Sequence, residues 1–183
     1  MSPAGTPRKS RTVPKSFRID QSALVAVEEE AASQNVSPNT LVNQILKQYA
    51  EYDRFARKVN TVKISSSTFR GLLSAADVDK VIDVAKASGS SIPQAFATAK
   101  NGKVDLDSLI DHVRSLATYS RVVEFSETIQ NYGHVVTLIH EYGLNWSIFL
   151  VHYLTAMFAQ IGISPKFEMS DRSVIFTLPG RQM

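Results

Sequence analysis

The stretch SFRIDQSALVAVEEEAASQNVSPNTLVNQILKQY, residues 16–49, decides the fold of the N-terminal part of this chain. Around its start, apolar and polar side chains alternate, which predicts a short β-strand over residues 13–19. On such a strand Phe17 lies on the mostly apolar face, whereas Ser16 and Arg18 lie on the polar face. The strand is therefore expected to have one face against a hydrophobic core and one face free for contact with a partner.

Two helices are predicted after this strand. The first begins at Asp20 or Ser22, both of which suit an N-cap, and it ends at Asn35, which tolerates the left-handed conformation. The second begins at Ser37 as N-cap, with Pro38 at the first helical position, where a missing N–H costs little. The apolar side chains that recur at helical spacing are Leu24, Val27 and Ala31 in the first helix and Leu41, Val42, Ile45, Leu46 and Tyr49 in the second.

This order of strand, helix, short turn and helix resembles the ribbon-helix-helix family of DNA-binding proteins over residues 12–53. The resemblance implies that two chains pair their strands into an antiparallel ribbon, which enters the major groove of double-stranded DNA, and that the four helices form the core of a homodimer. Physical reasoning also favours a dimer, because a segment of some 40 residues with one strand has an unpaired edge and too little core to be stable alone.

Carried over by position, the resemblance assigns base contacts to Ser16 and Arg18. Pro14 stands where the family usually has a third polar residue facing the groove, so part of the recognition is expected to move to Arg11 or Lys15. The start of the second helix is expected to bind a phosphate through free backbone N–H groups and the helix dipole. The full set of expected backbone contacts is Arg8, Lys9, Arg11, Lys15, Ser37, Asn39 and Thr40.

Charge and composition agree with a DNA-binding protein. The formal net charge is +3, but residues 1–18 hold five basic side chains and no acidic one, so we interpret residues 1–11 as a flexible basic arm. The 44% hydrophobic content is that of a globular protein, and the absence of cysteine excludes disulfides, thiolate metal sites and a cysteine nucleophile. We expect no secretory signal and no membrane span, and a cytoplasmic, nucleoid-associated protein.

Neither proline nor glycine occurs between Pro38 and Gly71, and an apolar stripe continues through Tyr52 and Phe55. We therefore expect one long helix over residues 38–58, which extends the DNA-binding domain to residues 12–58.

Residues 61–183 are expected to form a second domain of the α+β class with an antiparallel sheet, which senses a small-molecule effector or drives oligomerisation, up to a tetramer. The predicted elements are a strand at 61–66, a helix opened by Ser74–Asp77 and ended by Gly89, a helix at 93–99, a helix capped by Asp105, strands at 122–129 and 134–140 around a turn at 131–133, an uncharged helix at 146–161, and a hairpin of 167–170 with 173–178. The uncharged helix must be covered either by its own chain or by a second copy, and its aromatic residues Trp146, Phe149, Tyr153 and Phe158 could instead line an apolar cavity.

No catalytic or cofactor motif occurs in the sequence, so we expect neither an enzyme nor a cofactor. Three histidines are the candidates for a divalent metal site: His134 and His140, which share a strand face, and His152 on the uncharged helix. Histidines at strand ends and in cores are common, so no metal is the preferred interpretation.

Three functional classes remain open. The preferred one is a dimeric, sequence-specific transcriptional regulator, such as a repressor. The second is a plasmid-maintenance or DNA-organising protein, either a partition factor or an antitoxin, although the C-terminal half is rich in core residues for an antitoxin. The third is an enzyme tethered to DNA.

Overall fold

The computed structural model describes residues 12–130 and 133–179, and contacts divide the chain into two compact units, 1–46 and 47–183. The sequence predicts a boundary at residues 58–61. The boundary found from contacts lies after Leu46, so residues 47–58 group with the C-terminal unit. Tyr52 and Phe55 form a small hydrophobic cluster with Phe96, which places them with the C-terminal unit.

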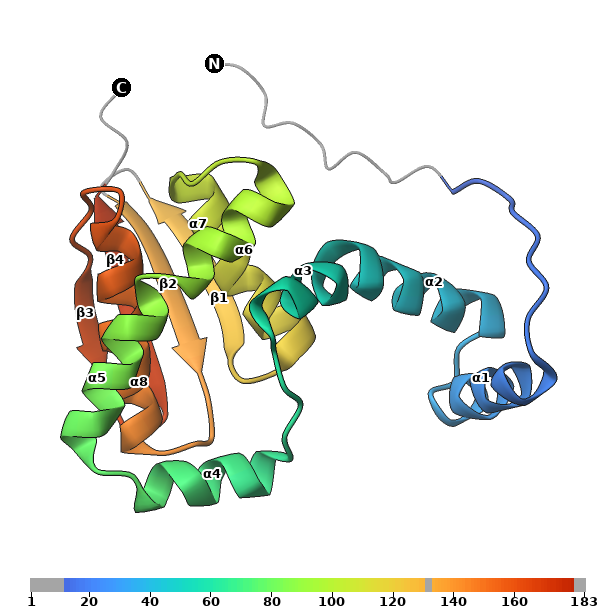
Figure 1. The fold of residues 1–183 in the computed structure, drawn as a ribbon, viewed down its shortest axis with the longest axis horizontal. Coiled ribbons are helices and arrows are strands. Elements are labelled where there is room, and N and C mark those ends of the chain that lie inside the picture. The colour runs from blue at the N-terminus through green and yellow to red at the C-terminus, as the bar shows by residue number, and fades with distance from the viewer. Residues whose placement is uncertain (1–11, 131–132, 180–183) are drawn as a thin grey trace. The chain divides into compact units, whose positions relative to one another are not determined.

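Two helices form the described part of the N-terminal unit, α1 (Gln21–Ser33) and the beginning of α2 (Pro38–Gln48), joined by a short turn (Figure 1). The Asp20 carboxylate caps α1 by accepting from the backbone N–H of Ser22 at 2.9 Å. Asn35 adopts φ +53°, and the Val36 N–H donates to the Ala31 carbonyl at 3.0 Å, as in a Schellman motif. Both expected ends of the first helix are confirmed.

Residues 12–20 have no regular secondary structure in this single chain, and their side chains are exposed. The strand expected over residues 13–19 is therefore not observed. The expected ribbon needs the same segment of a second chain, so it stays a prediction.

Helical turns continue from α2 to Val59, close to the end expected at residue 58, but they are not one regular α-helix. A π-helical turn, η1 (Tyr49–Asp53), is followed by α3 (Arg54–Ala56) and by a 3₁₀ turn, η2 (Arg57–Val59). Asn60 then ends the segment in the left-handed conformation, with φ +54°.

Four helices follow: α4 (Ser66–Ala75), α5 (Val78–Gly89), α6 (Ile92–Asn101) and α7 (Leu106–Ser115), which continues into a second π-helical turn, η3 (Leu116–Ser120). Asp105 caps α7 in a reciprocal capping box with Ser108, and Gly102 ends α6 with φ +71°. Asp77 caps α5 through the N–H groups of Asp79 and Lys80, so the expected helix is confirmed, but its cap is Asp77 rather than Ser74.

The strand expected over residues 61–66 is wrong. Residues 61–65 have no regular secondary structure, and Ser65 caps α4 by accepting from the Thr68 N–H at 3.2 Å. The serine run therefore starts a helix. Val62 is 82% exposed, and residues 61–65 pair with no strand of the described chain.

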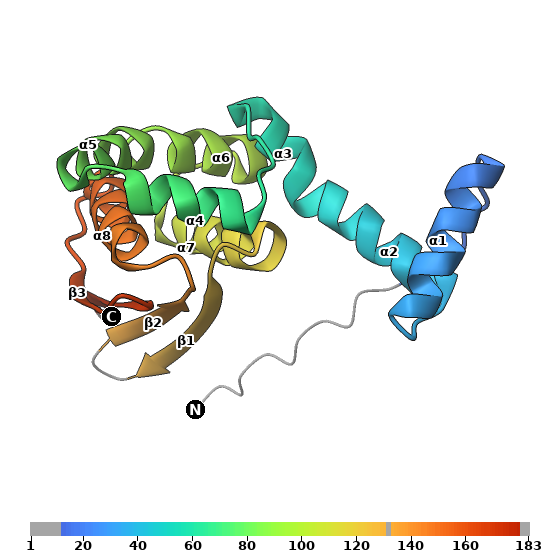
Figure 2. The ribbon, with the colours of Figure 1, turned by 90° about the horizontal axis from the view of Figure 1, so that it is seen from below.

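The sheet has the order β1-β2-β4-β3 and is antiparallel throughout, which confirms the expected α+β class. Its strands are β1 (Glu124–Gln130), β2 (Gly133–Ile139), β3 (Lys166–Met169) and β4 (Ser173–Pro179). The expected turn at residues 131–132 lies outside the described residues. Figure 2 shows the helices of this unit gathered on one face of the sheet.

The uncharged helix α8 (Leu144–Ala159) lies between the sheet and α5 (Figure 2). Its side chains Leu154, Met157 and Phe158 are almost fully buried, and Phe158 packs on Phe176 of β4 with ring centroids 5.7 Å apart. Elements of the same chain therefore cover α8. A second copy of the chain is therefore not needed to cover this helix.

Candidate functional sites

The expected base-reading side chains lie on the segment that precedes α1. Lys15, Ser16 and Arg18 are all exposed in this single chain. Arg8, Lys9 and Arg11 fall outside the described residues. Neither of the two expected base readers makes a hydrogen bond or ion pair among the described residues.

The expected phosphate anchor is the first turn of α2. The Ser37 hydroxyl accepts from the Thr40 N–H at 3.1 Å and contacts the Thr40 hydroxyl at 2.8 Å, so its role as N-cap is confirmed. Because Pro38 has no N–H and the Leu41 N–H donates to the Ser37 carbonyl, the Asn39 amide is the one in this described turn that is left for a phosphate. The sequence predicts several free backbone N–H groups at this helix start, whereas the described turn has one, that of Asn39.

The N-terminal unit leaves most of its apolar side chains exposed. Within residues 12–46, the described hydrophobic residues that are buried are Ala31 and Leu41. The exposed ones come from the predicted strand and from both helices: Val13, Phe17, Ile19, Leu24, Val25, Ile45 and Leu46. Phe17 is 66% exposed, although the sequence assigns it to the apolar face of the strand.

The three histidines considered as metal ligands have separate surroundings. His134 Nε2 lies 2.8 Å from Glu127 Oε2, whose other oxygen accepts from Arg114 at 2.6 Å. His140 is buried and lies 2.9 Å from the Ser147 hydroxyl, and its Nδ1 accepts from the Tyr142 N–H at 3.3 Å. Throughout the described ranges, no three histidine, cysteine or acidic side chains gather as a ligand group, so the three candidate histidines do not converge.

A fourth histidine, His112 on α7, is the one with the most unusual surroundings, and the sequence interpretation did not single it out. His112 is 2% exposed, its Nε2 lies 2.9 Å from the Tyr153 hydroxyl, and its ring centroid lies 4.9 Å from that of Phe96. Burial lowers the pKa of His112 to about 4, so the ring is neutral at pH 7. Its Nδ1 has no partner among the described atoms.

His112 and Tyr153 line a cavity of about 1010 Å³ in the C-terminal unit, which opens to solvent beside the exposed residues Val62 and Ile64. Its wall includes Trp146, Phe149 and Tyr153, which recur at helical spacing along α8, while Phe158, the fourth aromatic residue considered from the sequence, lies in the core beneath. The Trp146 ring stacks on Phe149 at 4.8 Å, and Phe149 stacks on Tyr153 at 5.5 Å. The sequence analysis gave an aromatic-lined cavity at this helix as an alternative, and such a cavity is present.

Both π-helical turns contribute to the cavity wall and contact each other. Tyr52 of η1 stacks on Tyr119 of η3 with ring centroids 5.5 Å apart, and the Tyr52 hydroxyl hydrogen-bonds to Ser120. The Tyr119 hydroxyl donates to Glu51 at 2.5 Å. Partial burial, helped by this carboxylate, raises the pKa of Tyr119 well above its usual range, so the hydroxyl keeps its proton.

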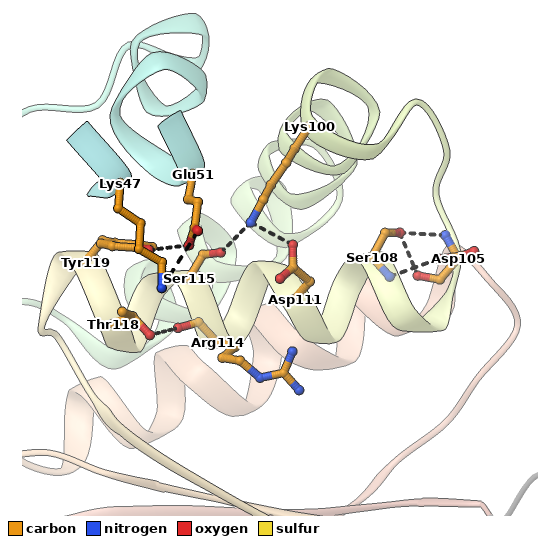
Figure 3. A network of polar contacts seen from close by, with 10 residues as sticks. All are labelled: Lys47, Glu51, Lys100, Asp105, Ser108, Asp111, Arg114, Ser115, Thr118 and Tyr119. Carbon is orange, nitrogen blue, oxygen red and sulfur yellow. Dashed lines mark hydrogen bonds and ion pairs between the residues drawn. The ribbon is translucent and has the colours of Figure 1, made fainter. Parts of the chain in front are cut away.

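Polar contacts join the neighbouring helices α6 and α7 (Figure 3). Lys100 of α6 reaches α7, where its Nζ lies 2.8 Å from Asp111 Oδ2 and donates to the Ser115 hydroxyl at 3.1 Å. Because Lys100 is only 16% exposed, this ion pair is more protected from solvent than a surface pair. The contact fixes α6 against α7, so the two helices that carry Phe96 and His112 are held in place.

No protein-family model matches this chain, and no curated protein matches it. Among the described residues, no helix combines the length and the apolar character that crossing a membrane requires.

Proposed function

We propose that the protein is a homodimeric, sequence-specific regulator of transcription that binds double-stranded DNA through a ribbon made of residues 13–19 from two chains. The supporting observation is the exposed apolar surface of the N-terminal unit. A folded unit that buries little beyond Ala31 and Leu41 lacks a sufficient core, and a second copy supplies one.

Pairing residues 13–19 of two chains as antiparallel strands would give each side chain of this segment a defined face. Alternation along a strand places Phe17 and Ile19 toward the helices and Ser16 and Arg18 toward the groove. Arginine can donate two parallel hydrogen bonds to guanine, and serine reads either partner less strictly. The Asn39 amide at the start of α2 would fix the protein on the DNA backbone without reading sequence.

The C-terminal unit, with its own core and cavity, serves as the effector-sensing or oligomerisation part of this regulator. We place the protein in the cytoplasm on the nucleoid.

The experiment is a selection of duplexes from a randomised library with the full-length protein, followed by affinity measurements on the selected duplex. Arg18→Ala should weaken binding by about 1–3 kcal/mol and reduce discrimination between sequences. Arg172→Ala, which removes an exposed arginine of the C-terminal unit, is the matched control and should bind like the wild type. Equal affinity and selectivity of Arg18→Ala and Arg172→Ala would refute the proposed groove contact.

A further inference from the structure

The cavity of the C-terminal unit has an apolar wall that a ligand can reach. Its volume of about 1010 Å³ lies at the upper end of small-molecule sites, which span roughly 300–1,000 Å³. Several apolar lining residues are not fully covered by other side chains and stay partly exposed: Val59, Phe69, Leu116, Val122, Tyr142 and Phe149. Their uncovered surface is free to contact an apolar ligand.

The shape of this wall favours an alkyl chain over a flat ring. Phe149 is stacked between Trp146 and Tyr153, so both of its faces are already covered. The wall therefore offers ring edges, together with aliphatic side chains such as Leu116 and Val122. A flexible chain of methylene groups can follow such an uneven surface, whereas a planar molecule needs a free ring face on which to stack.

The hydroxyl groups of the lining tyrosines are already hydrogen-bonded within the chain. The pairs are Tyr52 with Ser120, Tyr119 with Glu51, Tyr142 with Ser66, and Tyr153 with His112. A polar group of a ligand placed among them would lose its hydration without gaining a free partner, which costs free energy. The part of the ligand that enters the cavity is therefore expected to be apolar.

The entrance of the cavity, in contrast, carries two cations. The cavity opens beside Val62 and Ile64, and Lys63 lies between these two residues in the chain. Arg57 of η2 also belongs to the lining. Both cations are exposed, and neither makes an ion pair with an acidic side chain of the described residues. They are therefore available to an anionic group of a ligand.

The charge around the entrance is positive over a longer stretch of sequence. Between Asp53 and Asp77 the chain holds five basic residues and no acidic one. Asp53 is the one acidic residue of the described lining, and its carboxylate is contacted by the Gln48 side-chain amide at 3.4 Å. A surface of this charge attracts an anion and disfavours a cation.

We propose that this cavity binds a single-chain carboxylate, such as a free fatty acid, with the alkyl chain against the apolar wall and the carboxylate at the entrance beside Lys63 and Arg57. Lysine and arginine bind a carboxylate through charge-assisted hydrogen bonds. A charged end that stays at the entrance keeps part of its hydration, so the ligand avoids the cost of burying an ion. The site lies within the C-terminal unit, so the proposal does not rest on DNA binding.

The probe is cis-parinaric acid, a fluorescent straight-chain carboxylate whose emission rises in apolar surroundings. We expect it to bind the full-length protein saturably, with one molecule per chain. Its absorption overlaps the emission of Trp146, the only tryptophan of the chain, so binding should also quench Trp146. The absence of saturable binding would overturn the proposal. The titration contains no DNA, so this failure is distinct from a failure of the duplex selection.

Competitors with the same alkyl chain test the charge of the head group: dodecanoate, 1-dodecanol and dodecyltrimethylammonium, each below the concentration at which it forms micelles. We expect dodecanoate to displace the probe at about tenfold lower concentration than either of the others, because only its head group pairs with the entrance cations. Octanoate, which keeps the head group on a shorter chain, should be at least about tenfold weaker than dodecanoate. Equal displacement by dodecanoate and dodecanol, or by dodecanoate and octanoate, would overturn the proposal.

Charge-removing variants locate the head group. Lys63→Gln and Arg57→Gln should each weaken dodecanoate binding about three- to fivefold, as expected of a partly hydrated ion pair, and leave dodecanol binding unchanged. Lys58→Gln is the matched control, because Lys58 is exposed in the same 3₁₀ turn as Arg57 but does not line the cavity. If neither entrance variant binds dodecanoate more weakly than Lys58→Gln, the assigned head-group position is wrong.

A second pair of variants locates the alkyl chain. Val122→Gln places an amide on the apolar wall and should weaken dodecanoate binding about tenfold, since the chain would cover a polar group. Val84→Gln makes the same change at an exposed position of α5 outside the lining and should bind like the wild type. Equal affinities of these two variants would place the chain elsewhere and overturn the proposal. The entrance variants alter exposed side chains, so they test the site even if Val122→Gln does not fold.

Discussion

His112 sits in the core of the C-terminal unit, packed on Phe96 and within 2.9 Å of the Tyr153 hydroxyl. Its burial disfavours the charged imidazolium, which lowers the pKa of the ring from 6.5 to about 4. In the unfolded chain the same ring takes up a proton near pH 6.5. The folded state therefore loses stability as the pH falls from 6.5 to 4, because only the unfolded state gains the proton in that range.

We predict that the free energy of unfolding falls by about 3 kcal/mol between pH 7 and pH 4 through His112 alone. Urea unfolding over a pH series measures this loss. His112→Phe should flatten the profile in this window, whereas His152→Gln, at a partly exposed position of α8, serves as the control. A profile that keeps its slope in His112→Phe would show that another group carries the pH dependence.

At this scale the sequence predicts caps well and buried polar residues poorly. The sequence predicts Asp20, Ser37 and Asp105 as caps, because short polar side chains before an apolar run satisfy free amides, and all three do so. His112 was missed. Its position three residues after Leu109 on an apolar helix face is a signal that could have revealed its burial.

The elements of the C-terminal unit follow the periodicity of the sequence closely, with two kinds of exception. α4 was missed because Val62 and Ile64 alternate with polar residues as in a strand, while Ser65 caps a helix that starts one residue later. The π-helical turns η1 and η3 have no sequence signature of their own. They arise where Tyr52 and Tyr119 stack, a contact between residues far apart in the chain.

Gly89 has a role that its sequence position does not reveal. The sequence interprets it as the end of a helix, which is confirmed, but α5 also approaches α8 so closely there that an added Cβ would lie 2.3 Å from the Tyr153 carbonyl oxygen. Only a residue without a Cβ fits this contact without a shift of the backbone.

We therefore predict that Gly89→Ala lowers the free energy of unfolding by about 1–3 kcal/mol, since overpacking forces the two helices apart. Gly71→Ala in α4 is the control, because an added Cβ there meets nothing within 4 Å and alanine favours a helix by up to about 1 kcal/mol. Urea midpoints of the two variants should move in opposite directions. A Gly89→Ala protein as stable as the wild type would show that α5 and α8 separate without cost.

At the scale of the whole molecule, the two units differ in how they satisfy their apolar residues. The C-terminal unit covers its uncharged helix α8 with its own sheet and helices. The N-terminal unit leaves Phe17, Ile19 and the apolar positions of α1 and α2 exposed. In the proposed dimer, a second copy would cover these side chains and pair the segment that carries Arg18, and the basic residues 1–18 would then lie beside the DNA.

The central claim, sequence-specific DNA binding by this dimer, is tested most directly by recovering the DNA fragments crosslinked to the full-length protein in its own cell. We predict that these fragments share a short motif in two half-sites related by two-fold symmetry, and that an Arg18→Ala protein no longer enriches it. Fragments without a common motif, or the same fragments from the wild type and from Arg18→Ala, would contradict the account.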